Sequence, residues 1–286
     1  MNQTTALREI HVSDVTKTVA ELAIKTCYSL EDAIIEKIKA ARENEVHPVA
    51  KNILTKLEEN IEVSKEGIFP LCQDTGMACV FLEVGQDVHF IGGNIETAIN
   101  EGVKKGYTEG FLRKSVVKDP LKRENTGDNT PAHIVYDIVP GDKVKITFAP
   151  KGFGSENMSR IKMLPPSAGV EGIIDFVIET VKLAGANPCP PIVVGIGIGG
   201  TFDKVALLAK KALLVPADQS NSDPYYRDLE SQLLEKINNL GIGPQGFGGT
   251  TTALAVKIKA FPTHIAGLPV AVNINCHVSR HAEAVL

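Results

Sequence analysis

Residues that could carry chemistry surround Cys72, in the stretch FPLCQDTGMACVFLEVG that runs from Phe69 to Gly85. A cysteine can be a reactive thiol, a metal ligand or a small packed side chain. Asp74 could transfer a proton, and the amide of Gln73 could bind a carboxylate or a hydroxyl group. The structural alternative is an Asx-type turn, in which Asp74 accepts local backbone N–H groups. The stretch by itself leaves these interpretations open.

The cysteine count narrows the choice only in part. The chain has five cysteines, which are Cys27, Cys72, Cys79, Cys189 and Cys276. Their odd number, wide spacing and lack of a CxxC pair favour free thiols or metal ligands over a disulfide framework. Spacing alone favours packed or free thiols over a metal site. Cys27 lies among apolar helical positions, as expected of a small packed residue.

Two further polar segments could bind a ligand. Residues 110–133 carry five basic side chains before a polar turn, and the guanidinium of Arg113 could bind a carboxylate in bidentate geometry. A solvated basic surface is the alternative for this segment. Cys189 lies between two prolines in ANPCPP, where a rigid backbone suits a metal ligand and also suits a tight loop.

Glycine-rich segments follow the same region of the chain. GIGIGG, at 195–200, follows an apolar run and precedes a helical pattern, as a dinucleotide-binding turn would. Its glycines are spaced GxGxGG and not GxGxxG, so close packing of backbones is the favoured interpretation. KGFGSEN, at 151–157, could offer backbone N–H groups to an anion. His264, taken alone, is typical of a structural histidine.

The composition excludes several classes of protein. The chain has 286 residues, 43% hydrophobic and 22% charged, with a formal net charge of −4. A mildly acidic chain without a dense basic run argues against nucleic-acid binding. No apolar stretch reaches the roughly 18–20 residues that span a membrane, so no membrane segment is expected. The N-terminal residues do not resemble a signal peptide, so the expected compartment is the cytoplasm.

Periodicity predicts the elements that must position these residues. Helices are predicted over roughly 15–60, 94–110, 169–186, 201–214 and 223–241, and strands over 77–85, 87–93, 132–152, 191–200 and two C-terminal runs. Ser13 or Asp14 is expected to cap the first helix, and Asn94 is expected to cap the helix over 94–110, which has Gly106 near its end. The predicted fold is mixed α+β in one domain over residues 1–286. It is helical to about residue 68 and has a mixed or antiparallel sheet with packed helices from about 69 to 286.

Five motifs occur together and in a fixed order. They are PLCQDTG, LRKSVV followed by DPLKRENTGDNTPAHI, KGFGSENMSR, NPCPPIVVGIGIGGTFDK and PTHIAGLPVAVNINCH. Together they resemble the iron–sulfur hydro-lyases of the class I fumarase and L-tartrate dehydratase family, over nearly the whole chain. The likeness is to the α subunit of the two-subunit form.

The resemblance implies a cofactor and a reaction. Cys72, Cys189 and Cys276 match the ligands of a [4Fe–4S] cluster, whereas Cys27 and Cys79 do not. Three thiolates leave one iron without a protein ligand, which can act as a Lewis acid and which oxidants can remove. The implied reaction is the reversible hydration of fumarate to (S)-malate, a step of the tricarboxylic acid cycle. L(+)-tartrate and methyl-substituted fumarates are alternative substrates.

The resemblance also implies substrate contacts. The matching positions are Gln73, Asp74, Arg113, Gly154 and His264. Among these, Asp74 and His264 match groups that transfer protons, and Arg113 matches a contact to a substrate carboxylate. Gly152 is the alternative register for the glycine contact. Phe153 stands where glycine is common in the family, which would alter the pocket wall.

Further contacts in the family come from a domain that the two-subunit form carries separately. The resemblance therefore implies a β subunit, an α2β2 assembly and a small dicarboxylate substrate. Two alternatives are not enzymes: an iron-sensing protein that binds a cluster, and a structural subunit that binds zinc through the same cysteines and His264 or His277.

Overall fold

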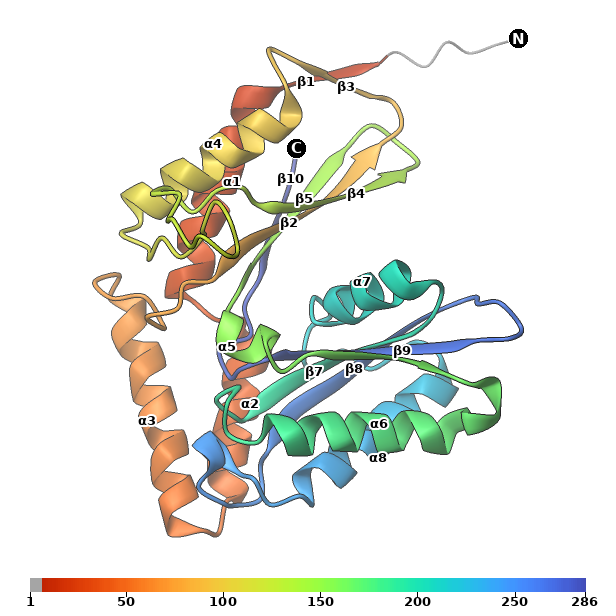
Figure 1. Cartoon of the computed structure of the whole chain (residues 1–286). Coiled ribbons are helices and arrows are strands. Elements are labelled where there is room, and N and C mark those ends of the chain that lie inside the picture. The colour runs from red at the N-terminus through yellow and green to blue at the C-terminus, as the bar shows by residue number, and fades with distance from the viewer. Residues whose placement is uncertain (1–6) are drawn as a thin grey trace. The chain divides into compact units, whose positions relative to one another are not determined.

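The computed structural model describes residues 7–286, in which the chain passes back and forth between two units (Figure 1). The first unit contains the chain up to Ser29, Val63–Lys151 and Arg280–Leu286. The second contains Leu30–Glu62 and Gly152–Ser279. Helices and a mixed sheet occur in both, which confirms the α+β class. The predicted single domain did not distinguish these units, and the helices before residue 68 are shared between them.

The first unit is a four-stranded sheet covered by two helices. The strand order is β10-β5-β2-β4, and β2 is parallel to β4 and antiparallel to β5. The elements are α1 Val12–Tyr28, α4 Ile95–Glu109, β2 Met77–Gly85, β4 His133–Val139, β5 Val144–Lys151 and β10 Ala282–Val285, with a short parallel pair of β1 Arg8–His11 and β3 Val88–Ile91. Because β2 lies between β4 and β5, the two strands joined by the Pro140–Asp142 turn do not pair with each other.

Helices α1 and α4 pack closely because α4 presents glycines to α1. A Cβ at Gly106 would lie 2.8 Å from the carbonyl oxygen of Ala20. Gly106 lies near the end of α4, as predicted, and Gly110 is the C-cap. The Asn94 cap is confirmed, because its side chain accepts the N–H of Thr97 at 3.0 Å.

The cap of α1 differs from the sequence prediction. The N-cap is His11, and not Ser13 or Asp14, because the His11 ring nitrogen Nδ1 accepts the N–H of Ser13 at 3.2 Å. Histidine is not among the usual capping residues, so the local sequence pattern did not reveal it.

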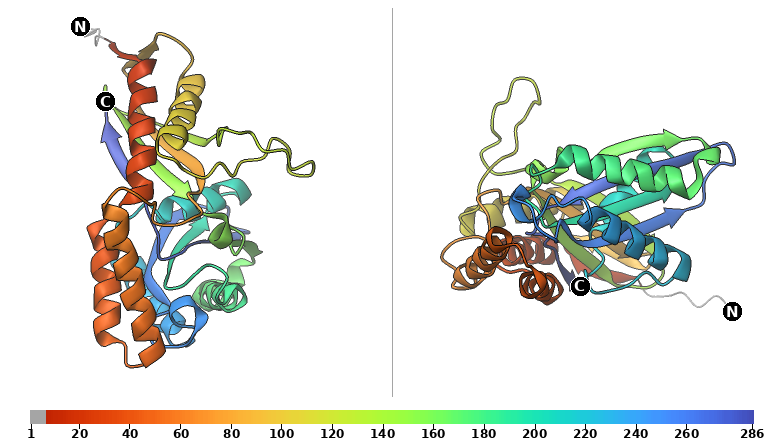
Figure 2. Two further views of the ribbon diagram at one scale, coloured as in Figure 1. Left: turned by 90° about the vertical axis from the view of Figure 1, so that its left-hand side faces the viewer. Right: turned by 90° about the horizontal axis from the view of Figure 1, so that it is seen from below.

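The second unit is built on a sheet ordered β6-β9-β7-β8. Strand β7 is parallel to β8 and antiparallel to β9. The strands are β6 Arg160–Leu164, β7 Ile192–Gly199, β8 Ala253–Phe261 and β9 Leu268–Asn275. The helices are α2 Asp32–Asn44, α3 Pro48–Lys65, α5 Phe153–Glu156, α6 Gly169–Ala184, α7 Phe202–Ala212 and α8 Pro224–Asn238, with 3₁₀ turns at Pro166–Ala168 and Pro244–Gly246. Figure 2 shows α2 and α3 side by side, where Arg42 and Glu58 form an ion pair.

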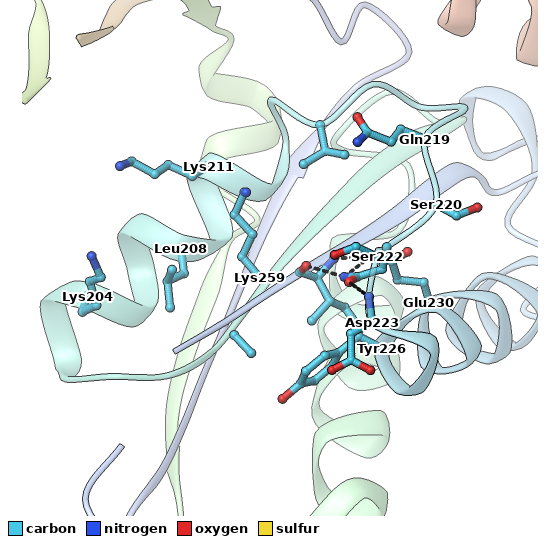
Figure 3. A pocket seen from close by; sticks show the side chains of 14 residues that line it. Lys204, Leu208, Lys211, Gln219, Ser220, Ser222, Asp223, Tyr226, Glu230 and Lys259 are labelled. Atoms are coloured by element: carbon cyan, nitrogen blue, oxygen red, sulfur yellow. Dashed lines mark hydrogen bonds between the residues drawn. The ribbon is translucent and has the colours of Figure 1, made fainter. Parts of the chain in front are cut away.

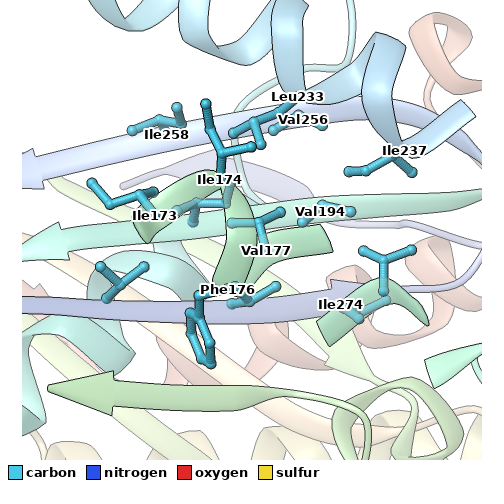
Figure 4. Packing of buried hydrophobic residues seen from close by; sticks show 14 of the residues in the cluster. Ile173, Ile174, Phe176, Val177, Val194, Leu233, Ile237, Val256, Ile258 and Ile274 are labelled. Atoms are coloured by element: carbon cyan, nitrogen blue, oxygen red, sulfur yellow. The ribbon is translucent and has the colours of Figure 1, made fainter. Parts of the chain in front are cut away.

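The core of the second unit lies on one face of this sheet (Figure 4). Phe176 and Val177 of α6 and Leu233 of α8 pack on Val194 and Ile274 of the strands. Helix α7 covers the opposite face (Figure 1). Because both faces are covered, β7 is buried along its whole length, which explains its unbroken apolar sequence. Within residues 7–286, none of the helices combines the length and apolar character needed to cross a membrane.

The glycines of β7 allow α7 to approach this sheet. A Cβ at Gly195 would lie 2.3 Å from the carbonyl oxygen of Ala209, and one at Gly197 would lie 2.2 Å from that of Val205. The close-packing interpretation of GIGIGG is therefore confirmed.

We expect Gly197→Ala to lower the free energy of unfolding by about 1–3 kcal/mol, because the added methyl group must displace the backbone of α7. Chemical denaturation measures the difference. Gly267→Ala is the matched control, since its Cβ would make only ordinary contacts, the nearest at 3.9 Å. Equal stability losses in the two variants would contradict the packing argument.

A buried carboxylate in the second unit joins the end of α2 to the loop before β8. Glu45 accepts the backbone N–H groups of Val46 and His47, and it accepts both the N–H and the hydroxyl of Thr250. Burial alone would raise the pKa of Glu45, but these hydrogen bonds outweigh burial and hold the pKa below its usual value.

A carboxyl group with a lowered pKa stabilises the fold above its unfolded-state pKa, and the stabilisation is lost as the pH falls through the lower folded-state pKa. We expect Glu45→Gln to lower the free energy of unfolding by about 1–3 kcal/mol above roughly pH 5, with the difference shrinking in more acidic solution. Denaturation at a series of pH values tests this. The exposed neighbour Glu43, replaced by Gln, should show almost no such difference.

Candidate active site

The Cys72–Gly76 turn leads directly into β2 of the first unit. The N–H of Asp74 donates to the Sγ of Cys72 at 3.4 Å, and the N–H of Gly76 donates to Oδ1 of Asp74 at 3.0 Å. The Asx-type turn is therefore present. Gly76 has a φ of +82°, and a Cβ there would lie 2.9 Å from the backbone of Lys151. Only glycine fits this position without displacing β5.

Three side chains hold the carbonyl groups of the turn. The buried hydroxyl of Tyr107, on α4, lies 3.1 Å from the oxygen of Thr75 and 2.9 Å from that of Gly76. Nδ2 of Asn129 also donates to Gly76, at 3.2 Å. Nη2 of Arg280 donates to the oxygen of Asp74 at 2.8 Å. These bonds from buried side chains fix the backbone of the turn.

Arg113 is attached to the same turn. The hydroxyl of Thr75 accepts the N–H of Arg113 at 2.9 Å and donates to its carbonyl oxygen at 3.2 Å. The side chains of Gln73 and Arg113 are exposed, whereas Cys72 and Asp74 are half-buried. The first unit therefore brings together four of the predicted site residues, two of which face solvent.

The second unit carries Cys189 and Cys276 at one end of its sheet. Cys189 lies just before β7, exposed and with a φ of +54°, and Cys276 directly follows β9. The Nδ1 of His277 lies 3.0 Å from the carbonyl oxygen of Cys189, which places the two cysteine segments side by side. The backbone N–H and the side-chain amide of Gln245 both donate to Pro190 and hold this loop.

Gly154 lies near the same loop. It belongs to the short helix α5, which begins after Gly152, and a Cβ at Gly154 would lie 3.7 Å from the carbonyl oxygen of Asn187. Asn273 of β9 and Lys210 of α7 bind the carboxylate of Glu156 and fasten α5 to the sheet. The backbone of Gly154 is exposed, and the side chain of its neighbour Phe153 is exposed as well.

His264 is the exception among the predicted residues. It is exposed in the loop between β8 and β9, where Nδ1 accepts the N–H of Ala266. That loop adjoins the Gly199 end of β7, because Phe261 pairs with Gly199. Cys189 and Cys276 lie at the opposite end, roughly 20–25 Å away along the eight-residue strand. The structure does not bring His264 together with these two cysteines of its own unit.

Burial divides the five cysteines into two groups. Cys27 and Cys79 are buried in the first unit, whereas Cys72, Cys189 and Cys276 are exposed or half-buried. Burial raises the pKa of the Cys27 thiol, and the nearby positive charge of Arg280 opposes that increase. Within the residues that the structure describes, neither unit gathers three His, Cys, Asp or Glu side chains into a metal site of its own.

A cavity of about 500 Å³ opens elsewhere on the second unit, among α7, α8 and the end of β8 (Figure 3). Lys204, Lys211 and Lys259 lie along its wall. The carboxylate of Glu230 accepts the N–H of Ile258 at 2.7 Å and thus serves the fold. The predicted site residues are all described by the structure, and none of them lines this cavity.

The sequence reasoning missed the side chains that support the turn. Tyr107 is separated from the turn by 31 and 32 residues, and Arg280 by 206. Asn129 belongs to a segment already singled out as polar, and its positive φ of +65° is a conformation that asparagine tolerates. Arg280 follows Cys276 by four residues, and this proximity in sequence was the one available signal.

Comparison with known proteins identifies the family. The family model described as fumarate hydratase (Fumerase) matches residues 16–285. The chain belongs to the fumarate hydratase family. A protein of Methanocaldococcus jannaschii carries the provisional name L(+)-tartrate dehydratase subunit alpha. It is 45% identical to this chain, over 95% of this chain and 96% of its own length. The L(+)-tartrate dehydratase subunits alpha of Escherichia coli UTI89 and K12 are 32% and 31% identical, each over 94% of this chain and 89% of its own.

The family assignment fixes the class of reaction. Fumarate hydratases and tartrate dehydratases both add or remove water, so this chain belongs to a hydro-lyase family. The relatives at 45% and 32% identity carry tartrate names and the family model carries a fumarate name, so the names do not choose between the two substrates.

We expect Tyr107→Phe to lower the free energy of unfolding by about 1–3 kcal/mol, because two buried carbonyl groups of the turn each lose one of their hydrogen-bond donors. Denaturant titration of the purified chain measures this. Tyr226→Phe, at a half-buried position of α8, is the matched control and should change stability by about 0.5 kcal/mol or less. An unchanged stability in Tyr107→Phe would show that the turn does not depend on this hydroxyl.

Proposed function

We propose that this chain is the α subunit of a [4Fe–4S]-dependent hydro-lyase that interconverts fumarate and (S)-malate. The observation that carries the proposal is the division of the cysteines. The three thiols that are not buried, Cys72, Cys189 and Cys276, are the three that the family resemblance selects as cluster ligands. The two buried thiols, Cys27 and Cys79, serve packing.

The residues present fit an anionic metal cluster. The Sγ of Cys72 accepts the N–H of Asp74, a type of hydrogen bond that stabilises thiolate sulfur. The buried guanidinium of Arg280 has two nitrogens without a hydrogen-bond partner among the described residues. When bound, the cluster would supply an iron without a protein ligand, which is a Lewis acid for a substrate hydroxyl group.

The chain's own residues would bind and orient the substrate. The exposed Arg113, whose backbone is fixed by Thr75, would bind a substrate carboxylate through its guanidinium. The amide of Gln73 would contact a second polar group of the substrate, and the backbone of Gly154 would contribute a further hydrogen bond. Asp74 would hold or move a proton, with Oδ1 already oriented by the N–H of Gly76.

A partner would complete the site. The relatives are named as alpha subunits, which supports a separate β subunit for this chain. The α2β2 assembly rests on the family resemblance alone. His264 keeps its predicted role in proton transfer only if a second copy of the chain supplies it, because it lies at the far end of the sheet from Cys189 and Cys276. The cytoplasm stays the predicted compartment.

L(+)-tartrate is the second candidate substrate, because the names of the relatives refer to it. Dehydration of tartrate to oxaloacetate would use the same thiols and the same carboxylate contacts. A substrate panel decides between the two. The co-expressed α and β chains, purified without oxygen, would be assayed with malate, fumarate and tartrate, and turnover of only tartrate would replace the fumarate proposal.

We expect Cys72→Ser, Cys189→Ser and Cys276→Ser each to abolish the brown iron–sulfur absorbance of the anaerobically purified protein, and prolonged aeration to abolish its activity. Cys79→Ser is the matched control and should retain the colour, because Cys79 is buried within β2. Loss of colour in the control to the same extent would contradict the ligand assignment. A colourless wild-type protein that contains zinc would support the structural alternative instead.

A further inference from the structure

Arg280 is a buried cation whose one hydrogen bond among the described residues goes to a neutral backbone carbonyl group. The residue is only 5% exposed. Nη2 donates to the carbonyl oxygen of Asp74, while Nε and Nη1 are buried and have no hydrogen-bond partner among residues 7–286. A buried guanidinium with two unused nitrogens is costly, because both its charge and its N–H groups have lost water.

The topology of the first unit places this cation beneath the Cys72–Gly76 turn. Strands β10 and β2 both pair with β5 in antiparallel register, so they run in the same direction. Ala282 and Val80 pair with the same residue of β5, Phe148. Arg280 precedes β10 at the end of the sheet where the turn precedes β2. The position therefore follows from strand register and not from a flexible loop.

Arg280 lies among two buried side chains, Cys27 and Tyr107, and near the half-buried carboxylate of Asp74. Burial raises the pKa values of both Cys27 and Tyr107, and the charge of Arg280 lowers each in part, which shows that the cation lies among them. The backbone links it to the first proposed ligand: Arg280 binds the carbonyl of Asp74, and the N–H of the same residue donates to the Sγ of Cys72. A negative charge on the Sγ of Cys72 would therefore be connected to the cation through the backbone of one residue, Asp74.

We propose that Arg280 is a positioning residue that supplies the buried counter-charge for the anionic metal cluster bound at Cys72. The inference rests on the proposed function, because it assumes that Cys72 is a cluster ligand. Three thiolates outweigh the positive charge of an iron–sulfide core, so the bound group is an anion that Arg280 stabilises. Nearby charges and hydrogen bonds to sulfur also set the reduction potential of such clusters.

The substrate is the other anion that could use this cation. The two sources differ in position, since the predicted substrate contacts Gln73 and Arg113 are exposed whereas Arg280 is buried beneath the turn. The geometry favours the permanently bound cluster. The experiment below separates the two sources.

The test compares Arg280→Met and Arg280→Lys with wild type, each co-expressed with the β subunit and purified without oxygen. Iron and sulfide content after reconstitution, the rate of cluster loss to a chelator and the midpoint potential of the cluster are measured. We expect Arg280→Met to lose the cluster roughly 10- to 100-fold faster and to shift its potential to more negative values. Arg280→Lys, which keeps the charge, should recover part of both properties.

Lys257→Met is the matched control. Lys257 is also a buried cation whose side chain donates to a backbone carbonyl, that of Gln219, and it lies within β8 of the second unit. This variant should retain the cluster and its potential. A loss that matches that of Arg280→Met would reduce the effect to general destabilisation and would overturn the proposal.

The remaining outcomes separate this proposal from the one on which it rests. If wild type takes up no cluster, the iron–sulfur function itself fails and the role of Arg280 fails with it. If wild type and Arg280→Met bind the cluster equally and share one potential, the role of Arg280 alone fails. If cluster content and potential stay unchanged while KM for the dicarboxylate rises, Arg280 serves the substrate and the cluster proposal is overturned.

Discussion

The buried hydroxyl of Tyr107 is the contact on which the arrangement around Cys72 depends. It binds the carbonyl groups of Thr75 and Gly76, which are the last two residues before β2. Tyr107 in turn is placed by α4, which can approach α1 only because Gly102 and Gly106 carry no side chain. A turn of five residues that exposes polar groups is therefore fixed by helix packing in the core of the unit. The position of the exposed polar groups of the turn therefore depends on how the two helices pack.

In the second unit, the ends of two strands position the candidate residues. Because β7 and β9 are antiparallel, the residue before one and the residue after the other lie at the same edge of the sheet. This brings the Cys189 and Cys276 segments together, although 87 residues separate them in sequence. The same register sends the loop that carries His264 to the opposite edge. Strand direction alone thus decides which predicted residues can act together within this unit.

The sequence predicted those features that depend on neighbouring residues. The strand 77–85, the Asn94 cap and the close packing of the β7 glycines all follow from local spacing and propensity. It could not predict that β2 lies between β4 and β5, because pairing is decided by contacts among distant segments. For the candidate site, the motifs identified Cys72, Gln73 and Asp74. Tyr107 and Arg280 carry no motif, and only the folded chain shows that they support the same turn.

The position of β10 has a consequence for the order in which the chain folds. Strand β10 occupies the edge of the first sheet next to β5, yet in the sequence it follows the whole of Gly152–Ser279. During synthesis, β5 therefore leaves the ribosome long before β10 exists, and the backbone groups on that edge of β5 face solvent in the meantime. The second unit can complete its own sheet during that interval. The first unit closes last, when the residues beyond Ser279 bring in β10 and Arg280, which binds the turn before β2.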